Sequence, residues 1–115
     1  MKKKFDVLYS DEAIEFLDDL SEKVREKIIY NIDKASYLTD PELFKKLTDT
    51  GIWEFRTKYS RMQYRILGFW DKEDKSNTWV ITSHGFVKKT NKVNSKEIRK
   101  AEKFKDLYFE TKPKK

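Results

Sequence analysis

The sequence predicts an α+β domain in which a small, mainly antiparallel sheet packs against helices. Apolar residues recur every three or four positions between 14 and 35 and again between 98 and 108, a spacing typical of helices with one buried face. Between 52 and 59 they instead alternate with polar residues, which is typical of a strand. The expected order is β-α-α-(short α)-β-β-β-α, with the helices on one side of the sheet.

The N-terminal part is predicted to be a strand followed by two helices. Residues 4–9 are rich in β-forming side chains. Ser10 or Asp11 then caps a helix with an acidic first turn, and Ser21 caps a second helix. The inward faces of the two helices are marked by Ile14, Leu17 and Leu20 and by Val24, Ile28, Ile32 and Ala35.

The C-terminal part is predicted to contain three strands and a helix. The strands span 52–59, 62–70 and 78–86, and the last two should pair as a hairpin around the polar loop 71–77. Before them, Asp40 followed by Pro41 predicts one short helical turn through residue 47. After them, Asn94 or Ser95 caps a last helix, whose inward stripe is Ile98, Ala101, Phe104 or Lys105, and Tyr108. We expect a single domain over residues 1–110 and a free basic tail at 111–115.

Length and composition restrict the classes of function. A chain of 115 residues has the length of one domain, and it carries a net charge of +6. The absence of cysteine excludes disulfides, zinc–thiolate sites and thiol nucleophiles and fits a reducing cytoplasm, while the single histidine excludes a multi-histidine metal site. No apolar run approaches the roughly 18–20 residues that span a bilayer. A basic domain of this kind has nucleic acid as a candidate partner.

The positive charge is concentrated in the second half of the chain. Residues 11–50 contain 6 basic and 11 acidic side chains, whereas residues 86–115 contain 11 basic and 4 acidic ones. This layout predicts an acidic helical side opposite a basic sheet face. The alternative is that the lysines only solvate exposed helix faces.

Charged residues on neighbouring strands form the candidate site. Glu54, Arg56 and Lys58 project from one strand face at a spacing of two, and Arg65 lies in the middle of the next strand. Such a group suits successive phosphates, but a salt bridge of Glu54 with Arg56 or Arg65 is the structural alternative. Cations also follow the third strand, at Lys88, Lys89 and Lys92.

Three other features have both a functional and a structural interpretation. His84 is the one side chain whose ordinary pKa lies near neutrality, so it is the acid–base candidate, or else a hydrogen-bonded structural residue. The tryptophans at 53, 70 and 79 stack on bases or pack in the core. Asp71, Glu73 and Asp74 form either a weak cation site or a solvated loop tip.

Several motifs resemble those of the RelE/ParE toxin superfamily, and within it the HigB-like, phage-derived host-inhibition branch. They are Gly51-Ile52-Trp53-Glu54-Phe55-Arg56, Gln63-Tyr64-Arg65-Ile66-Leu67, His84-Gly85-Phe86-Val87-Lys88-Lys89-Thr90, and the helix with Glu97 and Ala101. The resemblance covers roughly residues 5–110. It implies the toxin of a type II toxin–antitoxin pair that cuts mRNA in the ribosomal A site, without metal or cofactor, by attack of the RNA 2′-hydroxyl. It also implies a HigA-like helix-turn-helix antitoxin as partner.

The resemblance also suggests roles for individual residues. Arg65 would neutralise the scissile phosphate, with Arg56 and Lys88 as further cations and Glu54 or His84 as base or acid. RNA would be bound by Lys58, Arg61, Lys89 and Lys92. The chain departs from some relatives, which have a lysine at the position of Glu54 or a C-terminal tyrosine in the site. The alternative functions are a non-catalytic ParE-like toxin that targets gyrase, a decayed toxin, and a basic RNA-binding module.

Overall fold

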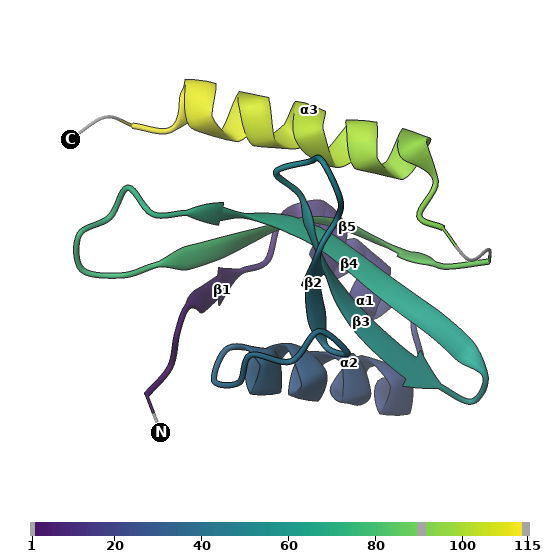
Figure 1. Ribbon diagram of the computed structural model, residues 1–115. Helices are drawn as coiled ribbons and strands as arrows, with labels where there is room; N and C mark the ends of the chain where they lie inside the picture. The colour runs from purple at the N-terminus through teal and green to yellow at the C-terminus, as the bar shows by residue number, and fades with distance from the viewer. Residues whose placement is uncertain (1, 90–91, 114–115) are drawn as a thin grey trace.

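The protein is described by a computed structural model that covers residues 2–89 and 92–113 (Figure 1). Its elements are β1 (Asp6–Leu8), α1 (Asp11–Asp18), α2 (Glu22–Ala35), β2 (Phe44–Lys46), β3 (Trp53–Tyr59), β4 (Met62–Asp71), β5 (Trp79–Val87) and α3 (Ser95–Thr111). The strands form one sheet in the order β1-β5-β4-β3-β2, and only the β1–β5 pair is parallel. The predicted α+β class is confirmed. Among the described residues, no helix has the length and apolar character needed to cross a membrane.

Serine side chains cap the N-termini of α1 and α2. Ser10 Oγ accepts a hydrogen bond from the Ala13 N–H at 3.1 Å, and Ser21 Oγ accepts one from the Val24 N–H at 3.4 Å. These bonds satisfy N–H groups that the first turn of a helix leaves without partners. The predicted helical pair is confirmed, and Asn94 caps α3 with its side chain in a similar way.

β4 is the central strand of the sheet. It pairs antiparallel with β3 and with β5, so the predicted hairpin around residues 71–77 is confirmed. The β3–β4 turn passes through Ser60 and Arg61, whose φ angles of 49° and 69° are the left-handed values that two-residue hairpin turns require. An irregularity between Leu67 and Gly68 leaves Ser83 of β5 without a partner in the register, as in a β-bulge.

The predicted short helix at residues 41–47 is wrong. The Asp40 carbonyl accepts hydrogen bonds from the N–H groups of Leu43 and Phe44, so the chain makes a single turn and then enters β2. Phe44 stacks on Phe55, with 4.4 Å between the ring centroids, and is buried. A tertiary contact therefore decides the conformation of this segment against its local helical signal.

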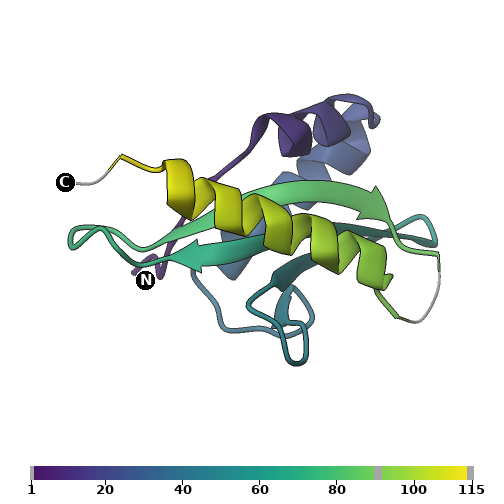
Figure 2. The same ribbon diagram turned by 90° about the horizontal axis from the view of Figure 1, so that it is seen from above.

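The helices cover both faces of the sheet, not one face as predicted (Figures 1 and 2). α1 and α2 pack on one face and α3 on the other. The reason lies in β4, where every residue from 64 to 69 is buried. Successive side chains of a strand point to opposite faces. Ile66 therefore enters the core beneath α1 and α2, while Leu67 and Phe69 enter the core beneath α3.

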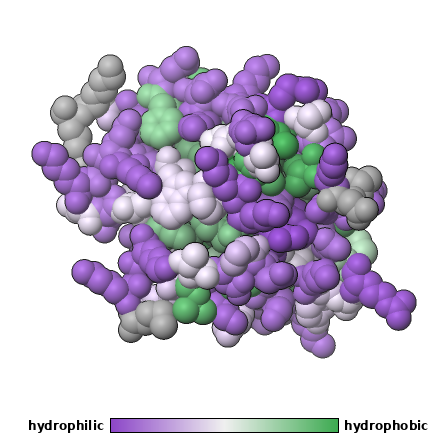
Figure 3. All heavy atoms as spheres, viewed as in Figure 1, coloured by the Kyte–Doolittle hydropathy of each residue, from purple (hydrophilic) through white to green (hydrophobic). Residues whose placement is uncertain are grey.

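The surface is strongly polar. Hydrophilic side chains cover most of the face seen in Figure 3, as expected for a chain with 40% charged residues. The large apolar side chains that stay exposed in the described part of the chain are Leu8, Ile14, Ile29, Tyr30, Met62 and Leu107. Three of these, Ile14, Ile29 and Tyr30, belong to α1 and α2.

Candidate active site

Two arginines lie directly opposite each other on β3 and β4, with a buried glutamate beside both. Arg56 and Arg65 are register partners. Glu54 Oε1 is 3.5 Å from Nε of Arg56, and Glu54 Oε2 is 3.6 Å from Nε of Arg65. Like charges that face each other across two strands repel. The carboxylate is therefore the counter-ion that lets both guanidinium groups share one sheet face, and both of the ion pairs considered from the sequence are present.

Arg65 is buried in the middle of the sheet, with 2% of its surface exposed. Its Nη1 donates to the Tyr64 carbonyl at 3.0 Å and its Nη2 to Oε1 of Gln63 at 2.7 Å. Nε of Arg65 and Oε2 of Glu54 have no hydrogen-bond partner among the described residues. Burial lowers the pKa of Arg65; Glu54 raises this pKa and Arg56 lowers it further. Because little water surrounds this guanidinium, it attracts an anion that reaches it more strongly than a guanidinium in bulk water would.

Lys88 extends this group of charges from β5. Its N–H donates to the Gln63 carbonyl at 2.8 Å, which continues the β4–β5 ladder beyond the end of the strand. Burial lowers the pKa of the Lys88 amine, and the positive charges of Arg65, Arg56 and Lys45 lower it too, while Glu54 raises it. The neutral form of Lys88 is therefore more accessible than that of a lysine in water.

Lys45 joins the same face, although the sequence placed it in a helical turn. β2 pairs with β3 so that Lys45 is the register partner of Glu54, and partners in register project from the same face. The signal in the sequence was the apolar Phe44 followed by the polar Lys45. A strand of three residues is too short for that signal to be decisive.

A cavity of about 280 Å³ opens at the outer edge of β3. β2 pairs only with residues 53–55, so the rest of β3 has no neighbouring strand on that side within the described residues. Five cations and one carboxylate are among the residues around the cavity, which concentrates positive potential where a phosphate chain would lie. The lining is Lys27, Asn31, Lys34, Glu42, Leu43, Arg56, Thr57, Lys58 and Arg65.

The contribution of α2 to this cavity was missed from the sequence. Lys27, Asn31 and Lys34 are spaced by four and three residues, so they share one helix face. The buried Asn31 donates from Nδ2 to Oγ1 of Thr57 at 3.2 Å, which ties this face of α2 to β3. The predicted acidic helical side therefore includes a basic flank, because α2 presents Lys27 and Lys34 to the basic sheet edge.

His84 belongs to β5, and its side chain contacts Glu97 of α3. It is 2% exposed, its Nδ1 lies 2.9 Å from Oγ of Ser83, and its Nε2 lies 3.0 Å from Oε1 of Glu97. Burial lowers the pKa of His84, with Glu97 acting in the opposite direction. Both ring nitrogens thus have protein partners, and His84 is not among the residues that line the cationic cavity.

The remaining predicted RNA-binding cations lie in different places. Lys58 lines the cavity. Arg61 is exposed in the β3–β4 turn, Lys89 is exposed just after β5, and Lys92 is exposed in the segment that leads to α3. Lys58 alone of these four lies at the cavity.

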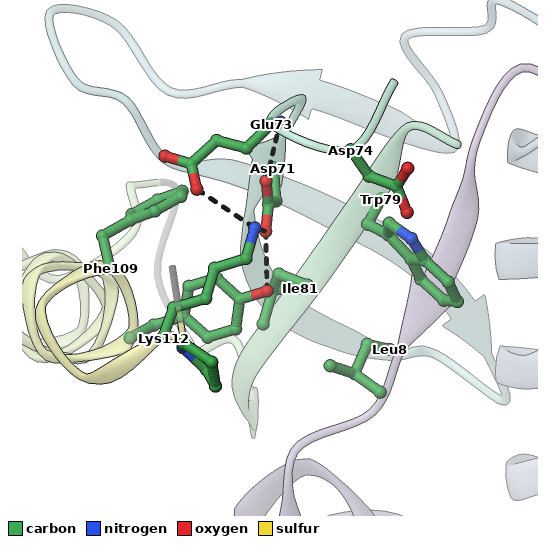
Figure 4. A pocket seen from close by; sticks show the side chains of 10 residues that line it. Leu8, Asp71, Glu73, Asp74, Trp79, Ile81, Phe109 and Lys112 are labelled. Carbon is green, nitrogen blue, oxygen red and sulfur yellow. Dashed lines mark hydrogen bonds and ion pairs between the residues drawn. The ribbon is translucent and has the colours of Figure 1, made fainter. Parts of the chain in front are cut away.

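The acidic loop cluster lies at the opposite end of β4. Asp71, Glu73 and Asp74 line a cavity of about 470 Å³, together with Trp79 and Phe109 (Figure 4). Within residues 2–89 and 92–113, no three carboxylate or imidazole side chains are grouped as metal ligands.

The start of the predicted free tail is attached to this cavity. α3 continues to Thr111, and Nζ of Lys112 donates to Oδ2 of Asp71 at 2.6 Å and to Oε1 of Glu73 at 3.1 Å. Tyr108 donates from its hydroxyl to the same Asp71 oxygen at 2.7 Å. The expectation of a free segment is therefore wrong for residues 111 and 112, while 114 and 115 lie outside the described residues.

We predict that Tyr108→Phe lowers the free energy of unfolding by about 1.5–3 kcal/mol at pH 7, because Asp71 loses a hydrogen bond to its charged form. Burial raises the pKa of Asp71, but the hydrogen bonds from Lys112, Tyr108 and the Glu73 N–H bring it below the ordinary 3.8. A lowered folded-state pKa contributes stability above the unfolded-state value that is lost in acid. The difference in the free energy of unfolding between wild type and variant, measured with urea, should be constant from pH 7 to 5 and should become smaller below about pH 4. A difference that grows in acid would contradict this assignment.

Comparison with known proteins shows the family. No curated protein matches the chain. The model of the phage-derived protein Gp49-like family (DUF891) matches residues 15–106, which include Glu54, Arg56, Arg65 and Lys88. This match covers most of the chain and almost the whole sheet. The protein therefore belongs to the phage-derived Gp49-like family, a RelE-like toxin family of toxin–antitoxin systems.

Proposed function

We propose that the protein is a type II toxin of the HigB-like branch that cuts mRNA on the ribosome, in the cytoplasm. The observation that carries this proposal is the grouping of Arg56, Arg65 and Lys88 around Glu54 beside a cation-lined cavity. Membership of a toxin family supports the toxin and its antitoxin partner. Cleavage of mRNA goes beyond family membership, and the geometry of the cationic site is what supports it.

The proposed reaction is an internal transesterification of RNA. The 2′-oxygen forms a bond to the adjacent phosphorus, and the bond from phosphorus to the 5′-oxygen breaks, which leaves a 2′,3′-cyclic phosphate and a 5′-hydroxyl. A base accepts the proton of the 2′-hydroxyl, and an acid donates a proton to the departing 5′-oxygen. The pentacoordinate phosphorus carries extra negative charge in the transition state, and positioned cations stabilise it.

The contacts of each side chain suggest its role. Arg65 and Arg56 stabilise the charge on phosphorus, with a phosphate oxygen taking the place of the Gln63 amide on Nη2 of Arg65. Glu54 holds the two arginines and is a positioning residue, since its oxygens face their Nε atoms. The RNA backbone follows the cavity past Lys58 and the two α2 lysines. His84 stabilises the contact of β5 with α3 through Glu97.

The experiment that tests the proposal combines the purified protein with ribosomes that carry a defined mRNA. We expect cuts within the A-site codon, 5′-hydroxyl and 2′,3′-cyclic phosphate ends, and no cutting without ribosomes. Intact mRNA would contradict the proposal. Two further assays separate the alternatives. If mRNA stays intact and the protein inhibits DNA supercoiling by gyrase, it is a gyrase-directed toxin. If the protein binds RNA and cells that express it grow normally, it is an RNA-binding module.

We propose Lys88 as the base that accepts the proton of the 2′-hydroxyl. Lys88→Arg is therefore predicted to lower the cleavage rate about 100-fold, because a guanidinium keeps the positive charge but does not exchange protons near neutral pH. The lowered pKa of Lys88 populates the neutral amine below the ordinary 10.5. The wild-type rate should therefore rise with pH and level off below that value, whereas the variant rate should not follow this rise. Lys103→Arg, on the exposed side of α3, is the matched control. A wild-type pH profile in Lys88→Arg would exclude Lys88 from proton transfer.

A further inference from the structure

A partly apolar groove lies between β1 and the α1–α2 pair, on the flank of α2 away from the cationic cavity. Two cavities, of about 240 and 520 Å³, form it, and both are lined by Tyr9 and Ile29. Ile14 is 43% exposed, Ile29 42% and Tyr30 60%. Exposed apolar side chains that gather along a groove are typical of a protein–protein contact.

Three carboxylates border this groove. Asp18, Glu26 and Asp33 line the two cavities, and none of them forms an ion pair with a described residue. The nearby cations are already engaged. Arg25 donates from Nη1 to the carbonyls of Leu17 and Leu20, and Lys3 pairs with Asp6. The groove lining therefore carries the three carboxylates Asp18, Glu26 and Asp33 against Lys3 and Arg25, which leaves a net negative charge around an apolar floor.

The charges of α2 are divided between its two flanks. Lys27 and Lys34 line the cationic cavity, whereas Glu26 and Asp33 line the apolar groove. The helix thus lies between a basic surface and a more acidic one, and Lys27 Nζ, 5.6 Å from the ring centre of Tyr30, marks the border between them. A polyanion suits the first surface, and a segment with apolar anchors flanked by Lys or Arg suits the second.

We propose that this groove is the docking surface for the antitoxin, through an amphipathic helix of the antitoxin with basic residues flanking its apolar face. An apolar groove of this kind accepts the apolar face of a helix, and the carboxylates Asp18, Glu26 and Asp33 select basic flanks. The proposal rests on membership of a toxin–antitoxin family and not on mRNA cleavage. A helix docked here leaves the cationic cavity on the other flank of α2 uncovered.

The test uses the full-length protein and the product of the reading frame that adjoins its gene. Ile29→Lys places a cation among the apolar anchors, and we expect its affinity for that product to fall at least about 30-fold with an unchanged melting temperature. Leu107→Lys, a similar exposed site on α3, should bind as wild type. The double variant Glu26→Gln, Asp33→Asn should associate about tenfold more slowly, with a weaker dependence of the association rate on salt.

Three results would overturn the docking proposal. In the first, the wild-type protein does not bind the adjoining product, and in the second, Ile29→Lys binds that product with wild-type affinity. In the third, the double variant Lys27→Glu, Lys34→Glu loses binding while Ile29→Lys binds normally. The last result would place the antitoxin in the cationic cavity. A protein that binds through the groove but leaves mRNA intact would retain this proposal and remove the proposed function.

Discussion

Replacement of Glu54 by Gln should lower the free energy of unfolding by about 3–5 kcal/mol. Arg56 and Arg65 face each other across β3 and β4, and Glu54 is the anion beside both Nε atoms. The amide keeps the size of the side chain but removes its charge. Arg65, 2% exposed, would then be a buried cation with a second cation opposite it. Urea unfolding at pH 7 measures the loss.

The control for this experiment is Glu102→Gln, at an exposed carboxylate on α3 that forms no ion pair with a described residue. It should change stability by less than about 0.5 kcal/mol. Equal stabilities of Glu54→Gln and wild type would show that the two arginines do not need this counter-ion. High salt should restore little stability to Glu54→Gln, because buried charges are screened poorly.

The proposed cleavage activity predicts that Arg65→Lys lowers the rate of mRNA cleavage by about 100- to 1,000-fold. A lysine keeps the charge, but it has neither the planar donors of the guanidinium nor the same reach. Arg65 holds the Tyr64 carbonyl and the Gln63 amide through separate nitrogens, a geometry that one ammonium does not reproduce. Single-turnover cleavage on programmed ribosomes measures the effect, and the melting temperature shows whether the variant remains folded.

Arg99→Lys makes the same chemical change at an exposed position of α3 and should leave cleavage unchanged. A folded Arg65→Lys variant that cuts at the wild-type rate would contradict the role of Arg65 at phosphorus. Equal losses in Arg65→Lys and Arg99→Lys would point to a general weakening of RNA binding instead.

Much of the fold follows from local patterns. The serine caps and the spacing of three or four residues predict α1 and α2, and alternation predicts β3, because both patterns report the face that one element buries. The grouping of Glu54 with Arg56 and Arg65 follows from that alternation and from the tight turn between β3 and β4. Sequence patterns therefore predicted the centre of the candidate site.

Other parts depend on contacts between distant residues. β2 exists because Phe44 packs on Phe55, and that strand brings Lys45 beside Glu54. The end of α3 is attached to the sheet through Tyr108 and Asp71, 37 residues apart. Both faces of β4 are covered because its buried residues run without interruption, a feature that a search for alternation does not detect.

Spacing along the chain is enough to predict the α+β class, most strands and helices, and a basic face centred on Arg56 and Arg65. The packing of distant segments was needed to establish which flank of α2 is basic, how deeply Arg65 is buried, and that the pKa of Lys88 is lowered. Burial and the field at a charge depend on every group that packs around it. For Lys88 those groups come from β2, β3 and β4, and their proximity is a property of the folded chain.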